Sequence, residues 1–138
     1  MLKLLVPVLG SASAAEAARY AALLFAEECV SDVEVLQICD QPTRGRETAF
    51  HSQSELKRYE KKLARDALLQ TRAILEAAGV PYRWKRVFGP PATTIAQHAA
   101  ADHADVVLLD AKHLGSIHRW TILAKLWRLS PTPVTMLH

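Results

Sequence analysis

Residues 2–9 read LKLLVPVL, an almost wholly apolar run that contains β-branched valines. Such a run is typical of a strand that helices cover on both faces of a parallel sheet, because a half-exposed strand would alternate apolar and polar side chains. The run ends at Gly10, and the apolar spacing then changes to that of a helix. We therefore predict a buried first strand, followed by a helix.

Two capping boxes indicate where the first two helices begin. Residues 13–16 (SAAE) have the S-x-x-E spacing in which each polar side chain bonds the backbone amide of the other, and apolar positions follow up to about Cys29. Residues 52–55 (SQSE) repeat the spacing and open a long second helix, which Gly79 ends. One face of this helix is predicted to hold Leu56, Tyr59, Leu63, Ala67, Ile74 and Ala78.

Four further strands and two further helices complete the predicted chain. Residues 33–39 (VEVLQIC) indicate the second strand. Residues 80–88 indicate the third, and its Arg83, Lys85 and Arg86 are typical of an exposed sheet edge. The remaining elements are a helix at 92–103, a buried strand at 105–110 (DVVLLD), a helix at 119–129 and a last strand at 134–138. The polar stretch 40–53 is predicted to be a mobile loop, with a lid over the binding crevice as the alternative.

This alternation of strands and helices predicts an α/β fold in one domain, residues 1–138. The expected architecture is a doubly wound, five-stranded parallel sheet of order 3-2-1-4-5 with helices on both faces. Ligands of such sheets bind beyond the carboxyl ends of the strands, where the strand order reverses. The crevice is therefore expected between the loop after Leu9 and the loop after Leu109.

Composition excludes several classes of protein. The chain has 50% hydrophobic and 22% charged residues and a net charge of only +3, too little for a nucleic-acid reader. No apolar run has the roughly 18 residues of a membrane span, so we expect a soluble, cytoplasmic protein. Cys29 and Cys39 are expected about 20 Å apart, as buried thiols without a disulfide.

Five short motifs resemble those of the universal stress protein family, in its order and over essentially the whole chain. Residues 4–11 (LLVPVLGS) look like its first strand, ILVPVDGS, and residues 33–39 look like its second. The other three are the turn at 89–95 (GPPATTI), the strand at 104–109 (ADVVLL) and the entry to the last strand at 131–134 (PTPV). The resemblance implies the fold of the adenine nucleotide alpha hydrolases.

Many members of that family bind ATP, through an Asp after the first strand and a G-x2-G-x9-G-[S/T] signature after the fourth. Here Leu9 replaces the Asp, Asp110 and His113 replace the first two glycines, and Trp120-Thr121 replaces the final pair. A carboxylate repels a triphosphate, and a Trp blocks close approach of backbone to phosphate. The sequence therefore predicts that the usual ATP site is lost and that no cofactor is needed, although an adenine nucleotide stays possible.

The candidate ligand-binding residues lie in and around the crevice. Gly10, Ser11 and Ser13 place amide and hydroxyl groups at a helix N-terminus, whose alternative role is a plain helix cap. By resemblance, Pro7, Val8 and Ile38 would line an adenine-sized pocket. The full candidate set is Pro7, Val8, Leu9, Gly10, Ser11, Ser13, Ile38, Asp110, Lys112, His113 and Gly115.

The loop after the fourth strand admits three interpretations. A solvated loop is the simplest. A positive rim made by Lys112, His113, His118 and Arg119 could bind a small anion. Asp110 with His113 and His118 could bind zinc, but three ligands in one loop without Cys or helical spacing are a weak signal, so no metal is expected. No strained G-x-S-x-G elbow accompanies a serine, so an enzyme is not expected.

The carboxyl-terminal segment predicts a homodimer. Trp120 and Trp127 widen the apolar surface of the last helix beyond what a covering helix needs. The last strand, Val134, Thr135, Met136 and Leu137, is short, apolar and expected at a sheet edge, where the family commonly pairs. The function expected is a dimeric stress-response or regulatory module that binds an unknown protein partner. The alternatives are an ATP- or AMP-binding switch with slow or no hydrolysis, and an interaction protein without a small ligand.

Overall fold

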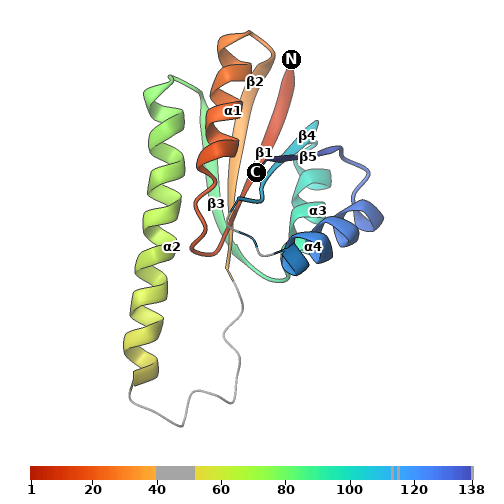
Figure 1. The fold of residues 1–138 in the computed structure, drawn as a ribbon. Helices are drawn as coiled ribbons and strands as arrows, with labels where there is room; N and C mark the ends of the chain where they lie inside the picture. Colours follow the sequence, from red (N-terminus) through yellow and green to blue (C-terminus); the bar gives the residue numbers. More distant parts are fainter. Residues whose placement is uncertain (40–51, 113, 115, 138) are drawn as a thin grey trace.

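The computed structural model describes residues 1–39, 52–112, 114 and 116–137, although not the side chains of residues 52–54 and 116–118. The predicted loop at 40–53 thus lies largely outside the described residues. The five strands form one sheet of order β3-β2-β1-β4-β5, and every neighbouring pair is parallel (Figure 1). This confirms the predicted doubly wound sheet. The strands are β1 (Leu2–Leu9), β2 (Val30–Cys39), β3 (Tyr82–Phe88), β4 (Val106–Asp110) and β5 (Val134–Leu137).

The helices cover the sheet in two pairs. Helices α1 (Ala15–Ala26) and α2 (Ser52–Ala77) lie on one face, and α3 (Pro91–Ala101) and α4 (Ser116–Leu129) lie on the other (Figure 1). The side chains of Leu4 and Val6 point into the first layer and that of Leu5 into the second, and all three are buried. Full burial of one such aliphatic side chain contributes about 1.5–3 kcal/mol, so the central strand needs an apolar run.

The first helix and second strand differ from the prediction. Helix α1 begins at Ala15, and the residue at its cap position is Ala14, whose side chain makes no cap hydrogen bond, so the predicted capping box at 13–16 is wrong. The helix ends at Ala26 rather than near Cys29, and β2 begins three residues earlier than predicted, at Val30. Cys29 is therefore exposed between helix and strand, not buried, while Cys39 is half-buried; neither forms a disulfide.

The first half of α2 is the second difference. Leu56 and Tyr59, predicted on its buried face, are 56% and 60% exposed. This half of the helix extends beyond the carboxyl ends of the strands, so the sheet does not cover it (Figure 1). The buried residues come from the second half of the helix and are Ala67, Leu68, Thr71 and Leu75. The remaining predicted boundaries differ from those observed by no more than three residues.

Both edges of the sheet are as predicted. Strand β3 is mostly exposed and carries Arg83, Lys85 and Arg86, and β5 lies at the opposite edge beside β4. In the part of the chain that the structure describes, no helix combines the length and hydropathy that crossing a membrane requires.

Candidate functional site

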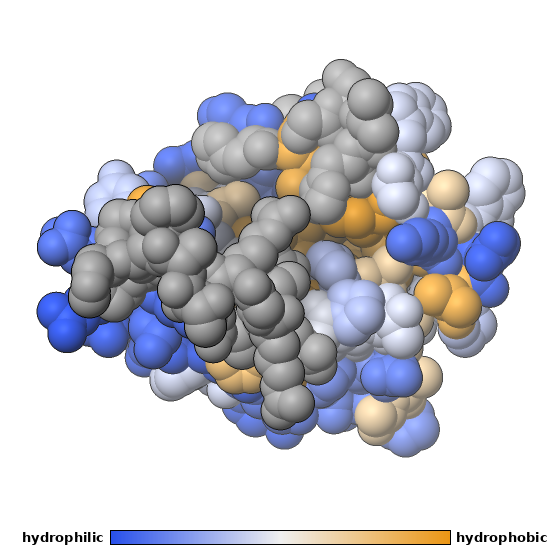
Figure 2. Space-filling model, turned by 90° about the horizontal axis from the view of Figure 1, so that it is seen from below, coloured by the Kyte–Doolittle hydropathy of each residue, from blue (hydrophilic) through white to orange (hydrophobic). Residues whose placement is uncertain are grey.

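The position predicted for a ligand crevice is the point where two adjacent loops leave the sheet. Strands β1 and β4 are neighbours, so the loop after Leu9 and the loop after Asp110 leave the sheet side by side. The chain crosses from β1 to one side of the sheet and from β4 to the other, which makes this the switch point where such folds bind ligands. Figure 2 views this end of the molecule: apolar side chains show near its middle, and hydrophilic ones surround them.

The loop after β1 is a tight turn. Gly10 has φ +60°, a left-handed conformation that glycine adopts without strain, and its amide donates to the Ile38 carbonyl at 2.8 Å. The amide of Ala12 donates back to the Leu9 carbonyl at 3.0 Å. Ser11 is exposed and Ser13 is half-buried. The turn therefore directs the chain from the sheet into α1.

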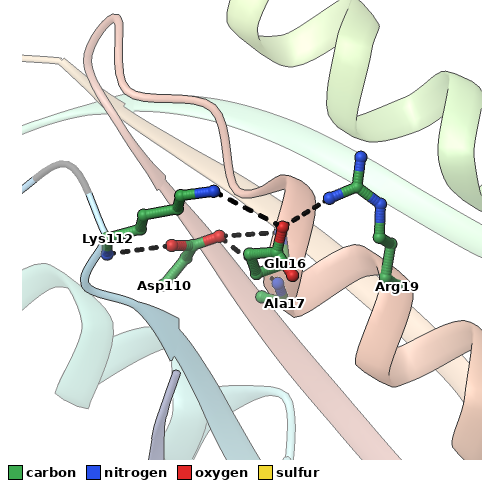
Figure 3. Close-up of polar contacts among 5 residues, drawn as sticks. All are labelled: Glu16, Ala17, Arg19, Asp110 and Lys112. Atoms are coloured by element: carbon green, nitrogen blue, oxygen red, sulfur yellow. Dashed lines mark hydrogen bonds and ion pairs between the residues drawn. The ribbon is translucent and has the colours of Figure 1, made fainter. Parts of the chain in front are cut away.

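Asp110 occupies the amino-terminal end of α1 (Figure 3). Its Oδ2 accepts hydrogen bonds from the amides of Glu16 at 2.9 Å and Ala17 at 3.3 Å, and its Oδ1 accepts one from the amide of Lys112 at 3.1 Å. The first amides of a helix have no partner within the helix and carry the positive end of its dipole. A carboxylate from the end of β4, 94 residues along the chain from Glu16, therefore caps α1 in place of the predicted Ser13.

Thr71 of α2 completes the cap. Its hydroxyl oxygen accepts a hydrogen bond from the Ala14 amide at 3.2 Å, and its hydroxyl donates to the Ala67 carbonyl at 2.9 Å. Two distant side chains thus bind three of the four amides of residues 14–17 at the start of α1, those of Ala14, Glu16 and Ala17.

The positive side chains of the predicted anion rim have partners in the structure. Nζ of Lys112 lies 3.8 Å from Oε1 of Glu16, which also pairs with Arg19 (Figure 3). Arg119 donates to the carbonyls of Ala111 at 3.0 Å and Leu114 at 3.4 Å and so fixes the loop after β4. His113 and Gly115 lie outside the described residues, as does the side chain of His118. In the described part of the chain, no three His, Cys, Asp or Glu side chains are placed to hold a metal ion.

The residues predicted to line an adenine pocket do not all share one face. Val8 is wholly buried against α1 and α2, whereas Ile38 is buried against the α3 and α4 layer. Leu9 pairs in register with Ile38 and packs into the same layer, and Pro7 is buried beside Leu36. The structure therefore brings together Leu9 and Ile38, next to Gly10.

Sequence reasoning missed Gln37, a wholly buried amide at the end of β2. Its Nε2 donates to the carbonyls of Ala64 in α2 at 2.6 Å and Gly10 at 3.3 Å. Its Oε1 accepts a hydrogen bond from Nε of Arg86 in β3 at 2.8 Å. The sequence did contain an indication, because a glutamine within the apolar run of residues 33–39 would be buried and a buried amide requires hydrogen-bond partners.

These features define a class: a doubly wound α/β domain in which the loops after β1 and β4 meet at the topological switch point. The model of the Universal stress protein family matches residues 1–138, so the chain belongs to that family. A comparison with curated proteins found no significant match.

Solved structures of the same family have the same fold. A universal stress protein from Lactobacillus plantarum is 24% identical with a TM-score of 0.68, over 99% of this chain and 97% of that one. A universal stress protein in complex with cAMP is 20% identical with a TM-score of 0.69, over 99% and 97%. A family member from Arabidopsis thaliana with AMP bound is 17% identical with a TM-score of 0.66, over 99% and 91%.

Proposed function

We propose that this universal stress protein is a dimeric regulatory module that acts through protein contacts and does not bind ATP in the usual way of its family. The observation that carries the proposal is the position of Asp110, whose carboxylate accepts hydrogen bonds from the amides of Glu16, Ala17 and Lys112. In nucleotide-binding members a glycine at this point lets phosphate approach the backbone. Two negative charges about 4 Å apart repel by roughly 1–4 kcal/mol, depending on the local dielectric.

The competing function is an adenine-nucleotide switch with slow or no hydrolysis. It is favoured by the relatives solved with cAMP and with AMP, and by the dAMP complex of a universal stress protein from Archaeoglobus fulgidus. Leu9, Ile38 and the turn at Gly10 would supply the apolar side and backbone groups for an adenine ring. A ligand with one phosphate would meet less repulsion from Asp110 than ATP would.

Two measurements separate these functions. The purified protein is denatured and its supernatant tested for released nucleotide, and ATP-Mg and AMP are then titrated into the nucleotide-free protein by calorimetry. We expect no nucleotide and no binding of ATP-Mg tighter than about 100 μM, which corresponds to about −5.5 kcal/mol. Tight binding of AMP or ATP would favour the switch.

A matched variant tests the role assigned to the carboxylate. Asp110→Asn keeps the shape of the side chain and removes its charge. A gain in ATP affinity in this variant, absent from Lys112→Ala, is expected if the carboxylate excludes phosphate. Equal ATP binding by the original protein and Asp110→Asn would contradict this account.

The proposed homodimer uses the free edge at β5 and the outer surface of α4. Trp120 and Trp127 are 68% and 87% exposed. They are seven positions apart, which is about two helical turns, so they lie on the same side of α4. Among the described residues β5 pairs only with β4, so its outer edge can offer backbone groups to a second copy. This arrangement supports antiparallel pairing of two β5 strands.

Light scattering at micromolar concentration tests the dimer. We expect twice the mass of the 15.3 kDa chain. The amides of Val107 in β4 and of Ala111, which follows β4, donate to the carbonyls of Pro133 and Leu137, so the amide of Met136 faces the free edge. Met136→Pro is therefore expected to give a folded monomer, while Met136→Ala stays dimeric. A monomeric original protein would refute the proposal.

A further inference from the structure

Three charged side chains meet at the amino-terminal end of the sheet, on the side of α3. Glu34 of β2 is 6% exposed, although it carries a carboxyl group. Nζ of Lys85 in β3 lies 3.2 Å from Oε1 of Glu34 and 3.5 Å from Oδ2 of Asp102, the residue that follows α3. The proposed crevice lies at the opposite end of the strands, so this cluster belongs to neither the ligand site nor the predicted dimer surface.

Each of the two carboxyl groups has one buried oxygen that lacks a hydrogen-bond donor in the described part of the chain. Oε1 of Glu34 and Oδ2 of Asp102 are buried, and among the described residues neither atom has a hydrogen-bond partner. Both oxygens lie close to the same ammonium nitrogen, 3.2 Å and 3.5 Å from Nζ of Lys85, so the two carboxyl groups are neighbours. Since two ionised carboxylates can only accept, a hydrogen bond between them requires that one of them keeps a proton. Without that proton, two negative charges would lie together beside the single ammonium group of Lys85.

We propose that Glu34 and Asp102 share one proton and, together with Lys85, form a proton-dependent latch that fastens the edge strand β3 and the end of α3 to β2. Burial raises the pKa of Glu34, and the hydrogen bond to Asp102 raises it further. The same hydrogen bond, donated by Glu34, holds the pKa of Asp102 below its ordinary value. The proton therefore resides on Glu34, and Asp102 is the ionised partner.

The groups around the pair favour a proton over a metal ion. A small cavity beside it is lined by Lys3 of β1, Asp32 of β2 and Arg83 of β3 as well as by Glu34 and Asp102. Arg83 pairs with Asp32 at 3.6 Å. The cationic side chains at and beside the cavity, those of Lys3, Arg83 and Lys85, match the three carboxyl groups in number and would repel a metal cation.

Two further titratable groups lie near the pair of Glu34 and Asp102. Asp105 accepts a hydrogen bond from the Lys3 amide at 2.8 Å, outside the pair. His98 of α3 lowers the pKa of Asp102 slightly, which reinforces its ionised state. The hydrogen bond with Glu34 raises the pKa of Lys85, and the charge of Asp102 raises it further, so the ammonium group stays charged wherever the pair titrates.

The latch should be strongest in weak acid. The folded state binds the Glu34 proton more tightly than the unfolded state, so this contribution to stability is complete below pH 4.5 and is lost as the pH rises through the raised pKa. The lowered pKa of Asp102 acts in the opposite direction: its contribution is present above pH 3.8 and is lost as the pH falls further. Between these limits both contributions coexist, and at higher pH β3 is expected to loosen.

Carbon-detected NMR titration of the carboxyl groups in the full chain tests the shared proton. We expect one group to keep its proton above the ordinary range of glutamate and Glu34→Gln to abolish that titration. If Glu34 and Asp102 both titrate near pH 4, as free carboxyl groups do, the proposal is wrong.

Amide hydrogen exchange of β3, corrected for the intrinsic effect of pH, tests the latch. Protection is expected to fall as the pH rises through the raised pKa of Glu34, by up to about tenfold for each unit by which that pKa is raised. Glu34→Gln supplies a donor that does not titrate, so its β3 protection should not change with pH. The matched control is Glu76→Gln, because Glu76 anchors β3 through the Tyr82 hydroxyl and has no carboxyl partner there. A pH dependence retained in Glu34→Gln would overturn the proposal.

Discussion

Carboxyl groups at the two ends of the sheet have opposite hydrogen-bonding surroundings. At the carboxyl-terminal end, Asp110 accepts three backbone hydrogen bonds, two of them from the start of α1. At the amino-terminal end, Glu34 is buried beside Asp102, the residue just after α3. In a doubly wound sheet the helices begin at the carboxyl ends of the strands and finish at the amino ends. The free amides of the helices therefore lie at the carboxyl-terminal end of the sheet, and their free carbonyls lie at the amino-terminal end. A carboxylate at the carboxyl-terminal end finds hydrogen-bond donors, whereas one at the amino-terminal end needs a proton or a cation.

The strongest test of this contrast removes the satisfied carboxylate. Asp110→Ala should lower the free energy of unfolding by about 2 kcal/mol, because it leaves amides of α1 without an acceptor and removes a favourable charge from the helix dipole. Asp110→Asn keeps one acceptor oxygen and should lose less. Urea denaturation of both variants measures the effect. An unchanged midpoint for Asp110→Ala would show that the cap contributes nothing.

A smaller effect is expected from removing the cation at the other end. Lys85→Met leaves Glu34 and Asp102 to face each other, so the loss should be about 1 kcal/mol at pH 8, since Lys85 is half exposed and its ion pairs are partly screened. At weakly acid pH, below the raised pKa of Glu34, the shared proton relieves the repulsion and the loss should be smaller. Urea denaturation at both pH values tests this, with Arg83→Met as the control. Equal losses at the two pH values would contradict the contrast.

The fold was predictable because its signals are local and redundant. The apolar runs at residues 2–9 and 105–110, the helical spacing between strands and the handedness of crossovers together lead to the observed strand order. The exposure of Leu56 and Tyr59 was not predictable, because periodicity marks an apolar face and does not show how far the sheet extends beneath it.

The site was only partly predictable, because its decisive contacts join residues far apart in the chain. Ser13 has the spacing of a cap, yet Asp110 and Thr71 supply the acceptors for the first amides of α1. The sequence predicts Asp110 in the crevice as a group that repels phosphate. It does not show that the amides of Glu16 and Ala17 in α1 donate hydrogen bonds to this carboxylate. Glu34 and Gln37 were read only as members of a strand, since the partners that explain their burial come from other elements.

The smallest expected effect comes from a carboxylate that resembles Asp110 in chemistry but not in surroundings. Asp105, just before β4, accepts one backbone hydrogen bond, from the Lys3 amide at 2.8 Å, in an exposed position at the amino-terminal end of the sheet. Water replaces this acceptor readily, so Asp105→Ala should cost no more than about 0.5 kcal/mol in urea denaturation. The loss of unfolding free energy could instead equal that of Asp110→Ala. In that case neither the number of amide donors nor the helix terminus would determine what a carboxylate contributes to stability, and the contrast between the two ends of the sheet would fail.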